Sequence, residues 1–162
     1  MNNIPKRKHI RIEDYDYSTP GAYFITVCTA NREKIFWSDR RGELCSPSNA
    51  PLSDIGMIVD HEIQKLNSVY DSLRVDKYCI MPDHIHLLIS IHNGEDTPEK
   101  RTSRIARFIG TFKRFCNKEY GENIWQGRFH DHVIRNQQDY DETWEYIANN
   151  PRKWAITRHI LE

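Results

Sequence analysis

The sequence predicts an α+β protein with a ferredoxin-like split β-α-β arrangement, in which an antiparallel sheet carries helices on one face. Segments rich in β-branched and aromatic residues alternate with segments whose apolar residues recur at helical spacing, and the resulting order is β-α-β-β-α-β-α. The chain has 162 residues, 38% of them hydrophobic, which is enough for one domain with a core. We expect a polar, basic arm over residues 1–16 and a single folded domain over residues 17–162.

The first half of the domain begins with a predicted strand at residues 22–28, which are mainly aromatic and β-branched. Residues 31–52 contain turn signals and two short apolar patches, and they fit a small hairpin or an ordered loop. Ser53 is a suitable N-cap for the first helix. The apolar residues of that helix follow at helical spacing: Ile55, Ile58, Val59, Ile63 and Leu66.

The second half continues with strands at residues 75–81 and 84–91, joined by a tight turn at Pro82-Asp83. A second helix is expected at residues 103–118, and a short fourth strand at 129–135. A third helix should occupy residues 139–149 and end before Pro151, because proline lacks the amide hydrogen that a helix interior needs. One face of the sheet remains free for this last helix or for a substrate.

Composition excludes several classes of protein. The formal net charge is zero, so any nucleic-acid site must come from the distribution of charge rather than its total. No apolar run approaches the roughly 20 residues that span a membrane. The four cysteines, Cys28, Cys45, Cys79 and Cys116, form no C-x-x-C pair, so we expect buried free thiols in a cytoplasmic protein.

Two histidines stand on the strand at residues 84–91. Side chains alternate across a sheet, so His84 and His86 share the face opposite Ile85, Leu87 and Ile89. Their Cβ atoms are expected about 7 Å apart, which lets both imidazoles reach one metal ion. The same pattern also fits two surface histidines on a half-solvated strand.

A tyrosine and an asparagine lie one turn apart on the last predicted helix. Tyr146 and Asn150 are four residues apart and therefore share a helical face. A metal-dependent nuclease with a covalent step needs a hydroxyl nucleophile, and an amide oxygen can act as a further ligand. Alternatively, Tyr146 packs on the sheet and Asn150 caps the helix before the proline.

Several motifs in the same order resemble those of the REP-associated tyrosine transposases, which are single-tyrosine transposases of the HUH class. These motifs are Ser18-Thr-Pro-Gly-Ala-Tyr-Phe-Ile-Thr26, Met81-Pro-Asp-His-Ile-His86, Trp125-Gln-Gly-Arg-Phe129, His132-Val-Ile-Arg-Asn136 and Tyr146-Ile-Ala-Asn-Asn-Pro151. The matches extend from about residue 17 to residue 154.

The resemblance implies that His84 and His86 bind a metal ion, that Tyr146 is the nucleophile and that Asn150 is a third ligand. Relatives from insertion sequences often carry glutamine at that last position. Two imidazoles and an amide oxygen suit Mg²⁺ or Mn²⁺. The implied activity is cleavage and rejoining of single-stranded DNA through a 5′-phosphotyrosine, on hairpin-forming repeat ends, by a monomer or a homodimer.

Cationic side chains on the second helix are candidate phosphate contacts. Arg104, Arg107, Arg114 and Lys118 form a stripe opposite the phenylalanines, Arg101 and Lys113 lie nearby, and His130 and Arg135 follow on the fourth strand. A stripe of this kind is equally compatible with an ordinary solvated helix face.

Two other functions also fit the predicted fold. One is a non-covalent module that binds single-stranded nucleic acid. The other is a zinc hydrolase that uses His84, His86 and either His130 or His132, with no covalent tyrosine.

Overall fold

The computed structural model describes residues 21–38, 52–92 and 104–160. The predicted arm at residues 1–16, Cys45 and Arg101 lie outside these ranges. In chain order the elements are β1 (Gly21–Cys28), the short 3-10 helix η1 (Ala30–Arg32), α1 (Asp54–Val69), β2 (Leu73–Ile80), β3 (His84–Ile91), α2 (Arg104–Tyr120), β4 (His130–Val133) and α3 (Gln137–Ile160).

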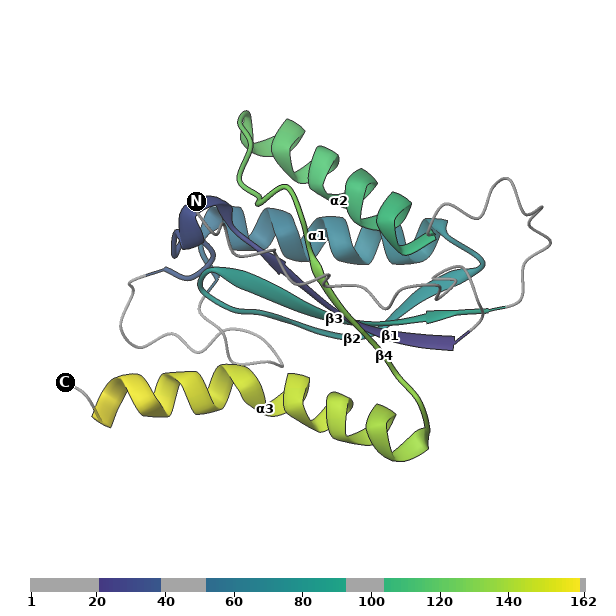
Figure 1. The fold of residues 1–162 in the computed structure, drawn as a ribbon. Helices are drawn as coiled ribbons and strands as arrows, with labels where there is room; N and C mark the ends of the chain where they lie inside the picture. The colour runs from purple at the N-terminus through teal and green to yellow at the C-terminus, as the bar shows by residue number, and fades with distance from the viewer. Residues whose placement is uncertain (1–20, 39–51, 93–103, 161–162) are drawn as a thin grey trace, which may run out of the picture.

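The four strands form one antiparallel sheet in the order β2-β3-β1-β4. Helices α1 and α2 cover one face of this sheet, and α3 lies across the other (Figure 1). The predicted α+β class, with a split β-α-β sheet and a C-terminal helix carrying Tyr146, is confirmed. The two faces carry different sets of side chains, and the candidate site lies on the face under α3.

The face under α1 and α2 holds the main hydrophobic core. Alternate residues of β3, among them Ile85, Leu87 and Ile89, are fully buried there. They pack with α1 and with Phe108 and Phe112 of α2, which are also fully buried. This packing follows from the two periodicities read in the sequence, two for the strand and 3.6 for the helices.

The face under α3 holds a smaller cluster, made of Cys79, Met81, Leu88 and Ile147. Partly buried residues surround it, and most of them are aromatic: Phe24, Trp37, Tyr140 and Trp154, with Ala22 and Ile134. Because His84 and His86 alternate with the residues of the main core, they project toward this second layer. The predicted orientation of the histidine pair is therefore confirmed.

Helix α3 does not end at Pro151, so the prediction of a helix over residues 139–149 was wrong at its C-terminal end. The helix continues to Ile160 with Pro151 inside it. A proline in a helix interior costs roughly 3 kcal/mol through the lost hydrogen bond and a ring clash. Packing beyond the proline favours the continued helix: Pro151 is buried, and the ring of Trp154 packs edge-on against Trp37 at 5.2 Å.

Smaller predictions were also confirmed. The Ser53 side chain accepts a hydrogen bond from the Gly56 amide at 3.1 Å and caps α1. Cys28, Cys79 and Cys116 are buried free thiols. The other elements differ from the predicted ranges by no more than two residues at either end, as expected where helix and strand ends are assigned.

Candidate active site

The two histidines of β3 meet at their outer ring nitrogens. His84 Nε2 and His86 Nε2 are 3.1 Å apart, and each ring is also held at its inner nitrogen. His84 Nδ1 lies 2.6 Å from Asp83 Oδ1, and His86 Nδ1 lies 2.8 Å from Thr26 Oγ1. Partners at both Nδ1 atoms fix the ring orientations and aim the two Nε2 atoms at one point.

This geometry matches a pair of ligands on one metal ion. Two ligands bonded at about 2.1 Å and separated by about 90° are about 3.0 Å apart, which is close to the observed spacing. His86 is only 6% exposed. Burial, reinforced by nearby His84 and Arg32, lowers the pKa of His86 to about 3, so its imidazole is neutral and able to donate a lone pair at physiological pH.

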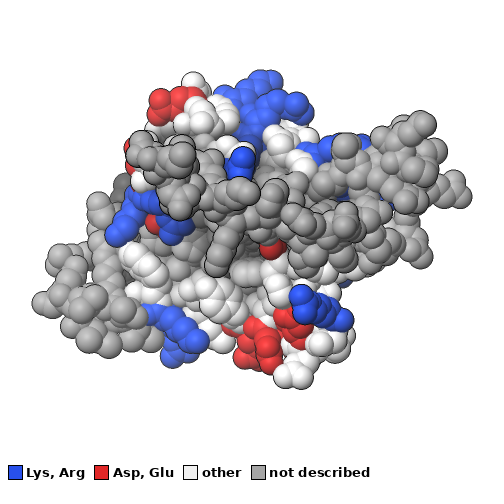
Figure 2. Space-filling view, viewed as in Figure 1, with Lys and Arg blue, Asp and Glu red and all other residues white. Residues whose placement is uncertain are grey.

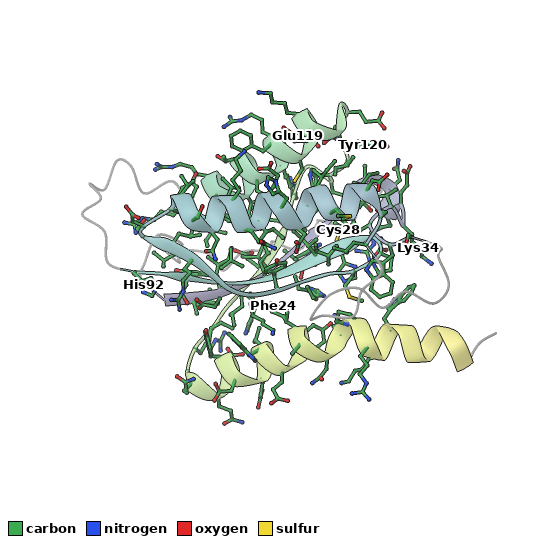
Figure 3. The ribbon with its side chains drawn as sticks, turned by 180° about the vertical axis from the view of Figure 1, so that it is seen from behind. Phe24, Cys28, Lys34, His92, Glu119 and Tyr120 are labelled. Carbon is green, nitrogen blue, oxygen red and sulfur yellow. The ribbon has the colours of Figure 1, made fainter. Side chains whose placement is uncertain are left out.

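Tyr146 lies against His86, the second histidine of the pair. Its ring centroid is 5.5 Å from that of His86 and 5.9 Å from that of Phe24, edge-on in the latter case. Phe24 projects from the sheet toward α3 and stacks on His86 at 5.1 Å (Figure 3). The rings of Phe24 and His86 form an aromatic floor under Tyr146. Although Tyr146 contacts this floor, its side chain is 50% exposed. The phenol ring is therefore both beside the His86 imidazole and accessible to a substrate.

Contacts on either side of Tyr146 attach α3 to the sheet. Tyr140 donates a hydrogen bond of 2.8 Å to Asp76, whose carboxylate also accepts from Arg74 and Ser90. One turn later Lys77 lies over the Trp144 ring at 5.1 Å. Beyond Tyr146, the contact between Trp37 and Trp154 holds the second half of α3 in place. Tyr146 thus faces the histidines of its own chain.

Asn150 lies one turn beyond Tyr146 and is half-buried. Its assignment as a third ligand stays a prediction. Within the described ranges, no three His, Cys, Asp or Glu side chains come together in a way that would hold a metal ion. The rival zinc site with His130 or His132 as its third ligand is therefore not formed: His130 pairs with Thr26 on the far side of β1 from His86.

The cationic stripe of α2 lies on the opposite side of the sheet from Tyr146. Arg107, Arg114 and Lys118 are exposed, and Figure 2 shows Lys and Arg side chains gathered over α2. Two other members are used within the fold: Arg104 donates to the His92 carbonyl at 3.3 Å, and Lys113 donates to the Gln126 carbonyl at 2.7 Å. Burial lowers the pKa of Lys113. The DNA-binding role of the whole set stays a prediction.

The remaining predicted contacts lie on β4, an edge strand of the sheet, and in the segment just after it. His130 and Arg135 are exposed. Neighbouring His132 reaches Asp139 in the first turn of α3, with Nε2 3.0 Å from Oδ2. His130 and His132 pair with Thr26 and Phe24 of β1, so they border the aromatic floor around Phe24.

Sequence reasoning missed three residues of the site, namely Thr26, Asp83 and Arg32. Asp83 stands directly before His84, which is a usable signal for a carboxylate partner. Thr26 could not be identified from the sequence, because its pairing with His86 depends on the β1–β3 register. Arg32 forms an ion pair with Asp83 from a segment that was expected to be a small hairpin or an ordered loop.

None of the helices in the described part of the chain combines the length and apolar character required to cross a membrane. The architecture is that of a sheet protein with two clustered histidines facing a tyrosine on a covering helix.

Comparison with known proteins agrees with the motifs. No protein-family model matches the chain. An uncharacterized protein of Haemophilus influenzae is 29% identical over 93% of this chain and 91% of its own length. From the same organism, a protein named "Putative REP-associated tyrosine transposase" is 27% identical over 91% of this chain and 79% of its own. A REP-associated tyrosine transposase of Escherichia coli is 33% identical over 54% of this chain and half (50%) of its own length.

A solved structure supports the same relationship. It is described as a REP-associated tyrosine transposase bound to a REP hairpin, and it aligns with a TM-score of 0.57 at 26% identity. The alignment covers 88% of this chain and 73% of that chain. The chain is therefore similar in sequence and fold to REP-associated tyrosine transposases, and the resemblance drawn from its sequence motifs is confirmed.

Proposed function

We propose that this protein cuts and rejoins single-stranded DNA through a covalent bond to Tyr146, with His84 and His86 holding a divalent metal ion. One observation carries the proposal. A half-exposed tyrosine ring lies 5.5 Å from the ring of His86, whose Nε2 is 3.1 Å from that of His84. A nucleophile beside a two-imidazole site is the minimum that metal-assisted phosphoryl transfer to a side chain requires.

The donor set fits Mn²⁺ or Mg²⁺ with one further oxygen ligand. Imidazole nitrogens bind Mn²⁺ and later transition metals, and the Asn150 amide would provide the oxygen. When bound, such an ion supplies Lewis-acid stabilisation of charge on a phosphate oxygen. Asp83 and Thr26 hold the two imidazoles in the orientation that this chemistry needs.

Tyr146 performs the covalent step. Its hydroxyl oxygen attacks the scissile phosphorus and loses its proton, the bond to the 3′ oxygen breaks, and a 5′-phosphotyrosine and a free 3′-hydroxyl remain. The attachment of α3 on both sides of Tyr146 restricts the position of the phenol before DNA arrives. Attack by another 3′-hydroxyl on the phosphotyrosine reverses the step, so strand joining needs no nucleotide cofactor.

Hairpin-forming DNA is the proposed substrate, because the solved relative is described as bound to a REP hairpin. The aromatic floor and the exposed His130 at the β4 edge offer stacking and polar contacts to an unpaired strand. The exposed cations of α2 offer a second region of phosphate contact on the other side of the sheet.

Denaturing gels with a labelled hairpin oligonucleotide and Mn²⁺ test the proposal. The reaction puts the 3′ portion of the strand on the protein, so a 3′ label should migrate with the polypeptide. A 5′ label should appear instead on a shorter free strand. Cleavage without a protein adduct would indicate a hydrolase, and binding without cleavage would indicate a non-catalytic module; either result rejects the proposed function.

A further inference from the structure

A chain of charged contacts lies behind His84. Asp83 uses one carboxylate oxygen for His84 Nδ1, at 2.6 Å, and the other for Arg32 Nε, at 3.1 Å. Arg32 also donates from Nη1 to the buried Cys28 sulfur at 2.7 Å. The Asp83 side chain is only 16% exposed.

The backbone is arranged to make this contact. Asn31 and Arg32 both adopt left-handed conformations, with φ of 55° and 57°, which are uncommon for residues that carry a Cβ. The Asp83 carbonyl accepts two hydrogen bonds from Thr29, from its amide at 2.9 Å and from its hydroxyl at 3.1 Å. The β1–η1 connection is thereby joined to the turn before β3, and the guanidinium is directed at the Asp83 carboxylate.

We propose that Asp83 is a positioning residue that keeps the His84 proton on Nδ1 and Nε2 bare, and that Arg32 holds Asp83 in place. This inference rests on the proposed metal site. A carboxylate only accepts hydrogen bonds, so contact with it requires a proton on Nδ1 of His84. The tautomer with a bare Nε2 is the one that binds a metal ion at that atom, and it fits the 3.1 Å approach of the two Nε2 atoms.

Arg32 contributes by fixing the second carboxylate oxygen. Without that ion pair the carboxylate can rotate away from His84, and the ring loses its orientation. Since the Arg32 side chain is 52% exposed, the ion pair is partly screened by solvent. We therefore expect Arg32 to matter less than Asp83 for metal binding.

Calorimetric Mn²⁺ titration of the full chain compares Asp83→Ala with wild type. Loss of an outer carboxylate partner typically weakens metal affinity by about 10- to 100-fold, and we expect a loss in that range. Asp83→Asn retains a carbonyl acceptor for His84 and should lose less, and Arg32→Ala should also lose less than Asp83→Ala. Asp71→Ala, at an exposed aspartate before β2, is the matched control and should bind as wild type.

Two further measurements separate positioning from a merely structural role. Nitrogen-15 NMR of the metal-free protein should place the His84 proton on Nδ1 in wild type and shift it toward Nε2 in Asp83→Ala. Saturating Mn²⁺ should return the cleavage rate of Asp83→Ala most of the way to wild type, whereas a misfolded variant would not recover.

The outcomes distinguish this inference from the proposed function. Wild-type affinity and an unchanged tautomer in Asp83→Ala would overturn the positioning role and leave the metal site intact. Failure of wild type to bind Mn²⁺, with no difference from His86→Ala, would overturn both. Weaker Mn²⁺ binding by Asp83→Ala, with an unchanged His84 tautomer and a metal-free melting temperature far below wild type, would reduce Asp83 to a folding residue and also reject the inference.

Discussion

The two faces of the sheet differ in how they are covered. Under α1 and α2 the side chains are apolar and almost wholly excluded from water, as Leu87 and Phe112 illustrate. Under α3 a small apolar cluster is bordered by histidines and aromatic rings, and Tyr146 stays 50% exposed. The first face holds the larger hydrophobic cluster, while the second keeps Tyr146 accessible. The main core and the proposed site of chemistry therefore lie on opposite faces of one sheet.

The largest effect is expected at the reacting oxygen. Tyr146→Phe should abolish cleavage and the covalent adduct while leaving DNA affinity near wild type, because the ring contacts to His86 and Phe24 remain. Tyr140→Phe is the matched control on the same helix. The Tyr140 hydroxyl donates a hydrogen bond to Asp76, and burial together with that carboxylate raises the pKa of Tyr140 to about 12. Tyr140 is therefore a poor nucleophile, and adduct formation should persist in Tyr140→Phe. An adduct in Tyr146→Phe that disappears in Tyr140→Phe would reverse the assignment.

Removal of the metal or of a ligand should be nearly as severe. Excess chelator should stop cleavage by wild type, and added Mn²⁺ or Mg²⁺ should restore it. His86→Ala should neither bind Mn²⁺ measurably nor cut, because one imidazole is too few to hold the ion. His61→Ala, at an exposed histidine on α1, should behave as wild type in both assays. Full activity in chelator would exclude the metal mechanism.

Substitutions on the face under α1 and α2 should change the stability of the protein rather than its cleavage activity. Phe112→Ala removes a fully buried ring under α2 and should lower the free energy of unfolding by about 3–5 kcal/mol, measured by denaturant titration. Cleavage per folded molecule should remain close to wild type, since the ring is on the opposite side of the sheet from Tyr146. A variant that stays fully folded but loses cleavage would contradict the separation of the two faces.

The smallest effect is expected on the exposed cations of α2. Replacing Arg114 and Lys118 by Gln should weaken binding of single-stranded DNA and reduce the slope of log affinity against log salt. Each lost phosphate contact lowers that slope by about 0.7, so the double variant should lose about 1.4. An unchanged slope would show that Arg114 and Lys118 make no phosphate contact.

The same two faces differ in how well the sequence predicted them. Strict alternation in β3 and helical spacing in α1 and α2 were sufficient to assign the main core and to place His84 and His86 on the other side. The extent of α3 was not predictable, because the Trp37–Trp154 contact that accompanies its continuation past Pro151 joins residues far apart in the chain. For the same reason the sequence showed neither the Thr26–His86 hydrogen bond nor the Arg32–Asp83 ion pair. The motifs contained the residues that we propose to react, but not all of those that hold them in place.

The central claim is that Tyr146 becomes covalently attached to DNA, and peptide mapping of the adduct tests it most directly. Wild-type protein would be incubated with a hairpin oligonucleotide and Mn²⁺, denatured, and digested with protease and nuclease before mass spectrometry. The account predicts a nucleotide remnant linked through phosphate to the peptide that contains Tyr146, with fragment ions placing the mass on that residue. A remnant on another residue such as Tyr140, or strand cleavage with no modified peptide, would contradict it.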